Sequence, residues 1–158
     1  MSLLSFFAWC EKSPLGEAIR GSLWLFPVIE SIHLLGLAVI GGAVLVLNLR
    51  LMGFGIARQP VDRLWRDTRP WLLGSLVVML VSGALLFTSE ATKLYYHGAF
   101  WVKMISLLLS IVFTFTVVRR VALADPLRPR PLWSKVVALV SLVLWSGVGV
   151  GGRWIGFS

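Results

Sequence analysis

Four long apolar runs constrain the fold of this chain more than any other feature of its sequence. The first extends from Leu23 to Leu49 without a lysine or an arginine, and as a helix it would measure roughly 40 Å, enough to cross a bilayer with some tilt. Three shorter runs with few charges follow it. We therefore expect an all-α integral membrane four-helix bundle that forms one domain over residues 1–158, with spans at about 23–49, 71–89, 100–118 and 132–150.

The composition supports membrane insertion and argues against a nucleic-acid-binding protein. Hydrophobic residues make up 58% of the chain, charged residues make up 14%, and the mean hydropathy is +0.86, which is too apolar for a soluble domain of this size. The formal net charge is +8, but the basic residues stand in blocks between the apolar runs instead of lining one polar face. We expect membrane lipid as a partner and no nucleic acid.

The distribution of positive charge predicts the orientation in the membrane, because cytoplasmic loops carry the excess of lysine and arginine. The loops after the first and third spans are strongly basic, whereas the opposite side has few basic residues. Both termini are therefore expected outside the cytoplasm, in a multi-pass protein of the bacterial inner membrane. The basic loop residues are Arg50, Arg58, Arg63, Arg66 and Arg69 after the first span, and Arg119, Arg120, Arg128, Arg130 and Lys135 after the third.

The first twenty residues are expected to lie along the outer membrane interface as a short helical segment. Residues 2–20 contain an apolar patch, but no basic segment precedes it and no small-residue cleavage site follows it, so we do not predict a removed signal peptide. Ser13 followed by Pro14 is typical of an N-cap and a first helical position, which predicts a helix that ends near Arg20. By the same reasoning, Pro70 and Pro131 are expected to begin the second and fourth spanning helices.

Two ionisable residues, Glu30 and His33, interrupt the first apolar span. They are three positions apart on one side of a helix, so we expect both to point into the bundle interior or into a wet cavity. Lys103 lies about one turn into the third span on the same outer side, and its long side chain could reach Glu30 or an anionic group. His97 lies in the outer loop before that span. A functional site and a polar network that only holds the helices together both explain these residues.

Several short motifs form a pattern that extends over most of the chain. IRGSLWLFPVIESIHLLGLAVIGGAVLVLNLRLMG is followed by SGALLF and by FWVKM. These stretches resemble an uncharacterised family of small four-helix bacterial membrane proteins. Asn48 stands where the family pattern has an acid, which weakens any role at that end, and His97 stands where a polar residue, commonly asparagine, is expected. The positions that match the pattern are Arg20, Ser22, Glu30, His33, Gly36, Arg50, Gly53, Phe100 and Lys103.

A second resemblance is limited to a histidine in the first span and a lysine in the third. In these two residues the chain is similar to the membrane domain of copper resistance protein D and to the small membrane protoporphyrinogen oxidase. That oxidase contains b-type haem, so the resemblance implies haem b here, with His33 as the axial ligand and Lys103 near a propionate. The predicted cofactor-binding residues also include Glu30, which could orient the His33 ring, together with His97 and Arg20.

We therefore expect a small haem-binding redox or electron-transfer protein with its site on the outer side. Its partner would be a redox protein or a quinone. Because the chain has only two histidines, one monomer can hold at most one haem with two histidine ligands. Other candidates for a second ligand are Met79, Met104 and Lys103.

Two alternatives stay open at this point. The first is copper handling, in which His33 and His97 act as metal ligands together with Cys10, Met79 and Met104. The second is a non-catalytic membrane subunit with a structural Glu-His-Lys network. The sequence contains no phosphate-binding loop, dinucleotide fingerprint or hydrolase motif, and it leaves open whether the chain is an enzyme and whether it forms a homo-oligomer.

Overall fold

A computed structural model describes residues 3–54, 59–124 and 131–155, and every regular element in these ranges is a helix. Within the same ranges, four helices are long and apolar enough to cross a membrane, which confirms the predicted all-α fold. Arg58, Arg128 and Arg130 lie outside the described residues. The elements are α1 (Leu3–Glu11), α2 (Pro14–Gly21), α3 (Leu25–Leu51), α4 (Val61–Tyr96), α5 (Gly98–Phe113), the π-helical turn η1 (Thr114–Val118), α6 (Arg119–Ala122) and α7 (Pro131–Ile155).

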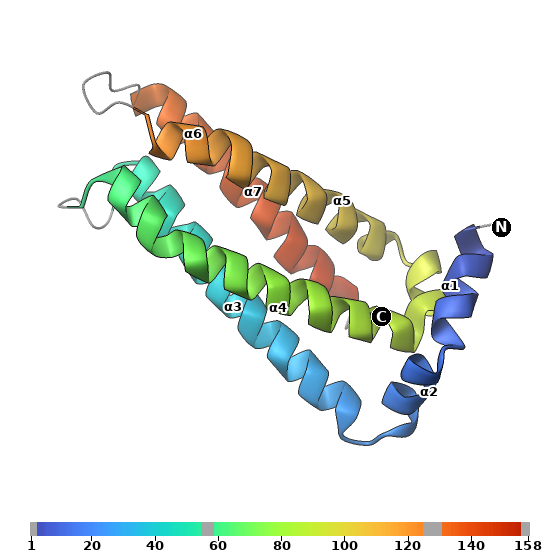
Figure 1. The fold of residues 1–158 in the computed structure, drawn as a ribbon. Helices are drawn as coiled ribbons and strands as arrows, with labels where there is room; N and C mark the ends of the chain where they lie inside the picture. Colours follow the sequence, from blue (N-terminus) through green and yellow to red (C-terminus); the bar gives the residue numbers. More distant parts are fainter. Residues whose placement is uncertain (1–2, 55–58, 125–130, 156–158) are drawn as a thin grey trace.

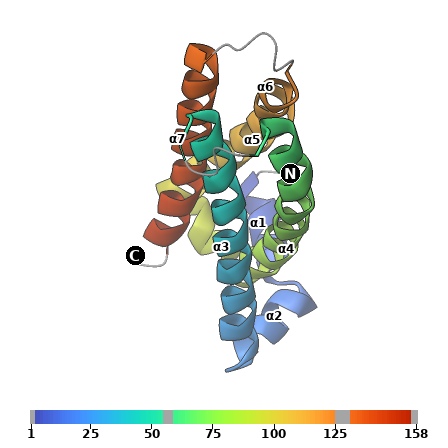
Figure 2. The same ribbon diagram turned by 90° about the vertical axis from the view of Figure 1, so that its left-hand side faces the viewer.

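The long helices form two antiparallel pairs that pack against each other (Figure 1). α3 packs along α4, α5 packs along α7, and contacts between α3 and α7 join the pairs. One end of the bundle holds α1, α2 and the C-terminal end of α7, and we call it the terminal end (Figures 1 and 2). The other end holds the C-terminal end of α3, the start of α4 and α6, and we call it the arginine-rich end. The core between the pairs includes Ile40, Leu47, Leu72, Val118 and Val148, each at most 1% exposed.

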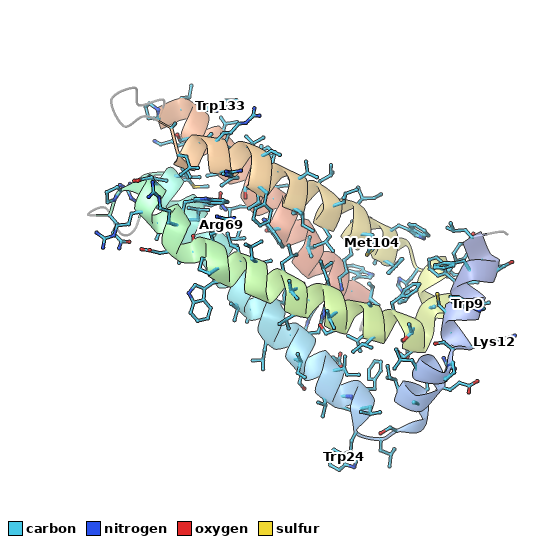
Figure 3. All side chains as sticks on the ribbon, in the orientation of Figure 1. Trp9, Lys12, Trp24, Arg69, Met104 and Trp133 are labelled. Atoms are coloured by element: carbon cyan, nitrogen blue, oxygen red, sulfur yellow. The ribbon has the colours of Figure 1, made fainter. Side chains whose placement is uncertain are left out.

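Large apolar side chains also cover the outside of the bundle. Leu35, Leu108 and Val143 are 67%, 65% and 63% exposed, as expected for residues that face lipid. Trp24 and Trp133 are exposed at opposite ends of the bundle (Figure 3), where tryptophan commonly marks the two membrane interfaces. The long helices therefore have the surface of a multi-pass membrane protein.

α4 is much longer than predicted, and the expectation that Pro70 begins this helix is wrong. The helix begins at Val61, after Pro60, and continues through Pro70. Proline removes one helical hydrogen bond, but Leu64 and Trp65 in the preceding turns are only 5% and 3% exposed. Burial of these two side chains in the core offsets the missing bond. Pro131, in contrast, does begin α7 as predicted.

α5 and α7 approach each other closely at two glycines of α7. A Cβ atom at Gly147 would lie 2.8 Å from Ser106 Oγ, and one at Gly151 would lie 3.3 Å from the Ala99 carbonyl oxygen. These distances are shorter than ordinary contacts, so a larger residue at either position would push the helices apart. The close spacing brings the start of α5 next to the end of α7.

Two buried polar contacts link helices inside the bundle. The Asn48 amide donates hydrogen bonds to the Val44 carbonyl oxygen at 2.8 Å and to Ser141 Oγ on α7 at 3.1 Å. Trp145 Nε1 on α7 donates to Thr114 Oγ1, in the first residue of η1, at 3.0 Å. Asn48 therefore connects α3 to α7.

The N-terminal helices fold against the terminal end of α4. Ser13 Oγ accepts a hydrogen bond from the Gly16 N–H at 3.2 Å, and Pro14 is the first residue of α2, which confirms the predicted helix start. Phe7 of α1 is buried and packs edge-to-face against Phe87 of α4, with ring centroids 5.0 Å apart. This contact fixes α1 across the end of the bundle.

α4 is kinked at Glu90, and next to this kink a hydrogen bond also joins α1 to α4. Glu90 has non-helical backbone angles, φ −136° and ψ 32°, which interrupt the helix at this point. The Glu11 carboxylate accepts a hydrogen bond from the Thr92 N–H at 2.6 Å. Hydrogen bonds from the Thr92 side chain and backbone lower the pKa of Glu11 below its usual value of 4.5. Glu11 thus caps the last segment of α4 in its ionised form.

Candidate functional site

The histidine of α3, His33, is buried and hydrogen-bonded to α4. The residue is 9% exposed, and its Nδ1 lies 2.8 Å from Ser82 Oγ, with the Met79 carbonyl beside the same ring. The Ser82 hydroxyl donates its single proton to the Val78 carbonyl oxygen at 2.6 Å. In the arrangement that satisfies both contacts, Nδ1 carries the ring proton and donates to Ser82 Oγ, which leaves a lone pair on Nε2. This is the tautomer that ligates a metal through Nε2.

Two glycines bring α3 and α4 together around the His33 ring. A Cβ atom at Gly83, the residue after Ser82, would lie 3.2 Å from His33 Cε1 and 3.7 Å from Nδ1. On the other helix, a Cβ atom at Gly36 would lie 3.2 Å from Met79 Cγ. The His33 ring therefore rests against the backbone of α4 at Gly83, and Ser82 accepts a hydrogen bond from its Nδ1–H. Ser82 and Gly83 together position the ring.

Lys103 approaches the same region from α5. Its side chain extends along the end of α7, where a Cβ atom at Gly152 would lie 3.4 Å from Lys103 Nζ and 3.5 Å from Cε. Its ammonium group is close enough to His33 for the two side chains to interact electrostatically. None of the ion pairs among the described residues involves Lys103. The structure therefore brings His33 and Lys103 to one region, with contributions from all four long helices.

Glu30 does not share the environment of His33, and of the two placements expected for the pair, the bundle interior is wrong for Glu30. Glu30 is exposed, one turn closer to the terminal end. No residue of the described ranges hydrogen-bonds to its carboxylate or pairs with it, Lys103 included. Residues three apart differ by about 60° around a helix axis, so one can face a neighbouring helix while the other faces outward. Ser82 of α4, and not Glu30, orients the His33 ring.

Arg20, another predicted cofactor-binding residue, forms contacts within the protein at the terminal end. Its guanidinium donates hydrogen bonds to the Ser89 carbonyl oxygen at 2.9 Å and to the Glu11 carbonyl oxygen at 2.8 Å. The Glu11 carboxylate lies 3.8 Å away. Arg20 thus links α2 to α1 and to the kinked part of α4, and its guanidinium group is engaged in these contacts.

His97 lies at the junction of α4 and α5, where its backbone N–H donates to the Leu94 carbonyl oxygen at 3.1 Å. It follows Ser82 by fifteen residues, which corresponds to roughly 20 Å of helix. Two axial ligands of one iron must reach the same atom. Because Ser82 contacts His33, this separation also keeps His97 away from His33.

The other predicted metal donors lie on three different helices. Met79 is buried on α4 beside Gly36, Met104 is 42% exposed on α5, and Cys10 lies on α1. In residues 3–54, 59–124 and 131–155, no group of three or more His, Cys, Asp or Glu side chains could hold a metal ion.

Residues 6–158 match DUF6644, described as a family of unknown function. The chain belongs to this family. His33, Ser82 and Lys103 all lie within the part that matches DUF6644. No curated protein and no solved structure matches the chain, so the likeness to copper resistance protein D and to the protoporphyrinogen oxidase stays a prediction.

The sequence prediction named His33 and Lys103, which the structure brings to one region, but it did not name the residues packed against them. Ser82 and Gly83 begin the stretch SGALLF, which was part of the family pattern but had no chemical role assigned to it. Gly151 and Gly152, against which Lys103 lies, were not singled out. A small-residue pair in an apolar span is a usable signal for such a site, because small residues let backbones and rings approach closely.

Proposed function

We propose that this DUF6644 protein binds one b-type haem in the terminal half of its bundle, which His33 would hold through Nε2, and that it acts in redox chemistry or electron transfer. The hydrogen bond between His33 Nδ1 and Ser82 Oγ carries this proposal. It orients the ring and favours the tautomer with a lone pair on Nε2, as is common for ligating histidines. When bound, haem supplies one-electron chemistry at its iron.

The sparse donor set favours haem over copper. A haem iron takes most of its ligands from the macrocycle and needs only one or two side chains. A copper site needs several protein donors, and the described residues offer no group of three His, Cys, Asp or Glu side chains. The proposal rests on the ligand chemistry of His33, and not on an enclosed cavity around it.

Lys103 is the second residue of the proposed site. Its ammonium lies near His33 and has no ion-pair partner among the described residues. A haem propionate is an anion that would satisfy this charge. Arg20 contacts Ser89 and Glu11, and His97 lies at the junction of α4 and α5. Of the predicted cofactor-binding residues, the proposed haem contacts therefore include only His33 and Lys103.

The membrane side of the site follows from the charge distribution. If the arginine-rich end faces the cytoplasm, as the positive-inside tendency favours, the terminal end faces outward. The haem of a bacterial inner-membrane protein would then lie in the half of the bilayer away from the cytoplasm. A redox partner or a quinone would exchange electrons with it on that side.

A structural function is the second candidate, and the same hydrogen bond favours it. The contact between His33 and Ser82 joins α3 to α4, and such interhelical bonds stabilise membrane bundles by modest amounts. In that case His33 would contribute to stability and would bind nothing. The two candidates differ in whether the isolated protein takes up haem.

The two histidines of the chain provide a matched pair of variants for the test. We would titrate haemin into the full chain in one detergent, as wild type, His33→Ala and His97→Ala, and follow the Soret absorbance. Wild type and His97→Ala should bind one haem per chain with similar affinity. His33→Ala should bind more than about 100-fold more weakly, beyond the usual cost of removing only a ligand's hydrogen-bond partner. Equal affinities for the two variants, or no uptake by wild type, would overturn the proposal.

Metal analysis of the same samples separates the remaining candidates. Stoichiometric copper in wild type without haem uptake would favour copper handling. Neither haem nor copper, together with a loss of stability in His33→Ala, would favour the structural function.

A further inference from the structure

A surface hollow at the arginine-rich end is lined by three arginines. Its volume is about 320 Å³, and its lining residues are Trp65, Arg66, Arg69, Arg119 and Leu123. α4 supplies the first three of these residues, and Arg119 comes from the first position of α6. Figure 3 marks Arg69 on α4 at this end of the bundle. Residues 50 positions apart in the sequence thus place like charges around one hollow.

Within the described ranges, only one of the three guanidinium groups has an ion-pair partner. Arg66 lies 3.9 Å from the Asp62 carboxylate, four residues earlier on the same helix. The side chains of Arg69 and Arg119 have no hydrogen bond or ion pair with any residue in the described ranges. The positive charges of Arg69 and Arg119 repel each other and have no ion-pair partner among the described residues, so an anion bound between them would be stabilised.

The hollow combines this charge with an apolar lining. Trp65 is only 3% exposed and packs edge-to-face against Phe115, so its ring is a fixed part of the lining. Leu123 is 42% exposed at the rim. Arg66 and Arg69 precede the long uncharged part of α4 that begins at Trp71, which places them where an apolar span meets the membrane surface.

We propose that this hollow binds a phosphate group, and that an anionic phospholipid head group supplies it. Arginine presents a planar fork of donors that fits phosphate oxygens, and Arg69 and Arg119 would bind the phosphate from two helices. The apolar lining suits a lipid, and so does the position of the hollow where the apolar part of α4 begins. The acyl chains of the lipid would continue along the exposed apolar surface of α4. This site is separate from His33 and does not depend on haem binding.

Native mass spectrometry of the full chain in a neutral detergent tests the proposal. The probes are phosphatidylglycerol, phosphatidylcholine and inorganic phosphate, each added separately. Arg69→Gln and Arg119→Gln should weaken phosphatidylglycerol retention by about tenfold or more, as expected for a lost charge-assisted hydrogen bond. Arg69→Lys keeps the charge but not the fork, and it should weaken retention as well.

Arg120→Gln is the matched control, because Arg120 neighbours Arg119 and is exposed but does not line the hollow. It should stay within about twofold of wild type, since it loses no direct contact. An equal loss in Arg120→Gln, or full retention in Arg69→Lys, would show diffuse attraction to surface charge and overturn the site. Binding of inorganic phosphate that depends on Arg69, without retention of phosphatidylglycerol, would overturn the lipid as its source.

Discussion

Replacing Ser82 with alanine tests how the protein holds His33. The Ser82 hydroxyl accepts a hydrogen bond from Nδ1–H of His33, and the two residues are only 4% and 9% exposed. Hydrogen bonds between membrane helices average about 0.6 kcal/mol and reach about 1.7 kcal/mol, so the free energy of unfolding should fall by about 1 kcal/mol. Haem affinity should fall by about 10- to 100-fold, the usual cost of removing the hydrogen-bond partner of a ligating histidine.

Ser75→Ala is the matched control for this change. Ser75 lies on the same helix and is 7% exposed, but its hydroxyl donates to the Trp71 carbonyl oxygen of its own helix at 2.6 Å. Its loss should change the free energy of unfolding by less than about 0.5 kcal/mol and should leave haem affinity unchanged. The assays are equilibrium unfolding in mixed micelles and haemin titration. If the two alanine variants bind haem equally well, the argument that Ser82 orients the ligand is refuted.

Three further changes test other parts of the structure. Gly83→Ala places a methyl group 3.2 Å from His33 Cε1 and should lower the free energy of unfolding by about 1–3 kcal/mol. Gly74→Ala is the control, because a Cβ atom there has no neighbouring atom within 4 Å, and it should be neutral or stabilising. Equal denaturation midpoints for the two variants would contradict this. Glu11 has a lowered pKa in the folded protein, so its stabilising contribution should be present above pH 4.5 and be lost as the pH falls below it. Glu11→Gln should therefore lower the melting temperature at pH 7 and lose this effect in acid, and a pH-independent difference would argue against the cap. Lys103→Met should shift the haem midpoint potential measured by redox titration, and an unchanged potential would remove Lys103 from the haem contacts.

The spans could be predicted from sequence because lipid selects for composition over long stretches. The run without lysine or arginine from Leu23 to Leu49 corresponds closely to α3, which extends from Leu25 to Leu51. The start of α2 at Ser13 and Pro14 was predictable for a different reason, since capping is decided by neighbouring residues. Both signals are local in the chain.

The features that sequence reasoning missed depend on contacts between helices. Pro70 reads as a helix start, but α4 continues through it because Trp65 is held in the core by residues far away in the sequence. His33 and Ser82 are 49 residues apart, and nothing within α3 shows which side of it α4 covers. For the same reason the outward direction of Glu30 could not be inferred from its spacing to His33.

The central claim is that His33 is a haem ligand, and an absorption difference spectrum tests it most directly. The full chain would be produced with haem supplied, purified, and measured in oxidised and dithionite-reduced forms, with His33→Ala treated in parallel. We predict a Soret band with sharp reduced α and β bands in wild type and their loss in His33→Ala. A wild-type protein without these bands, or a variant that retains them, would contradict the account.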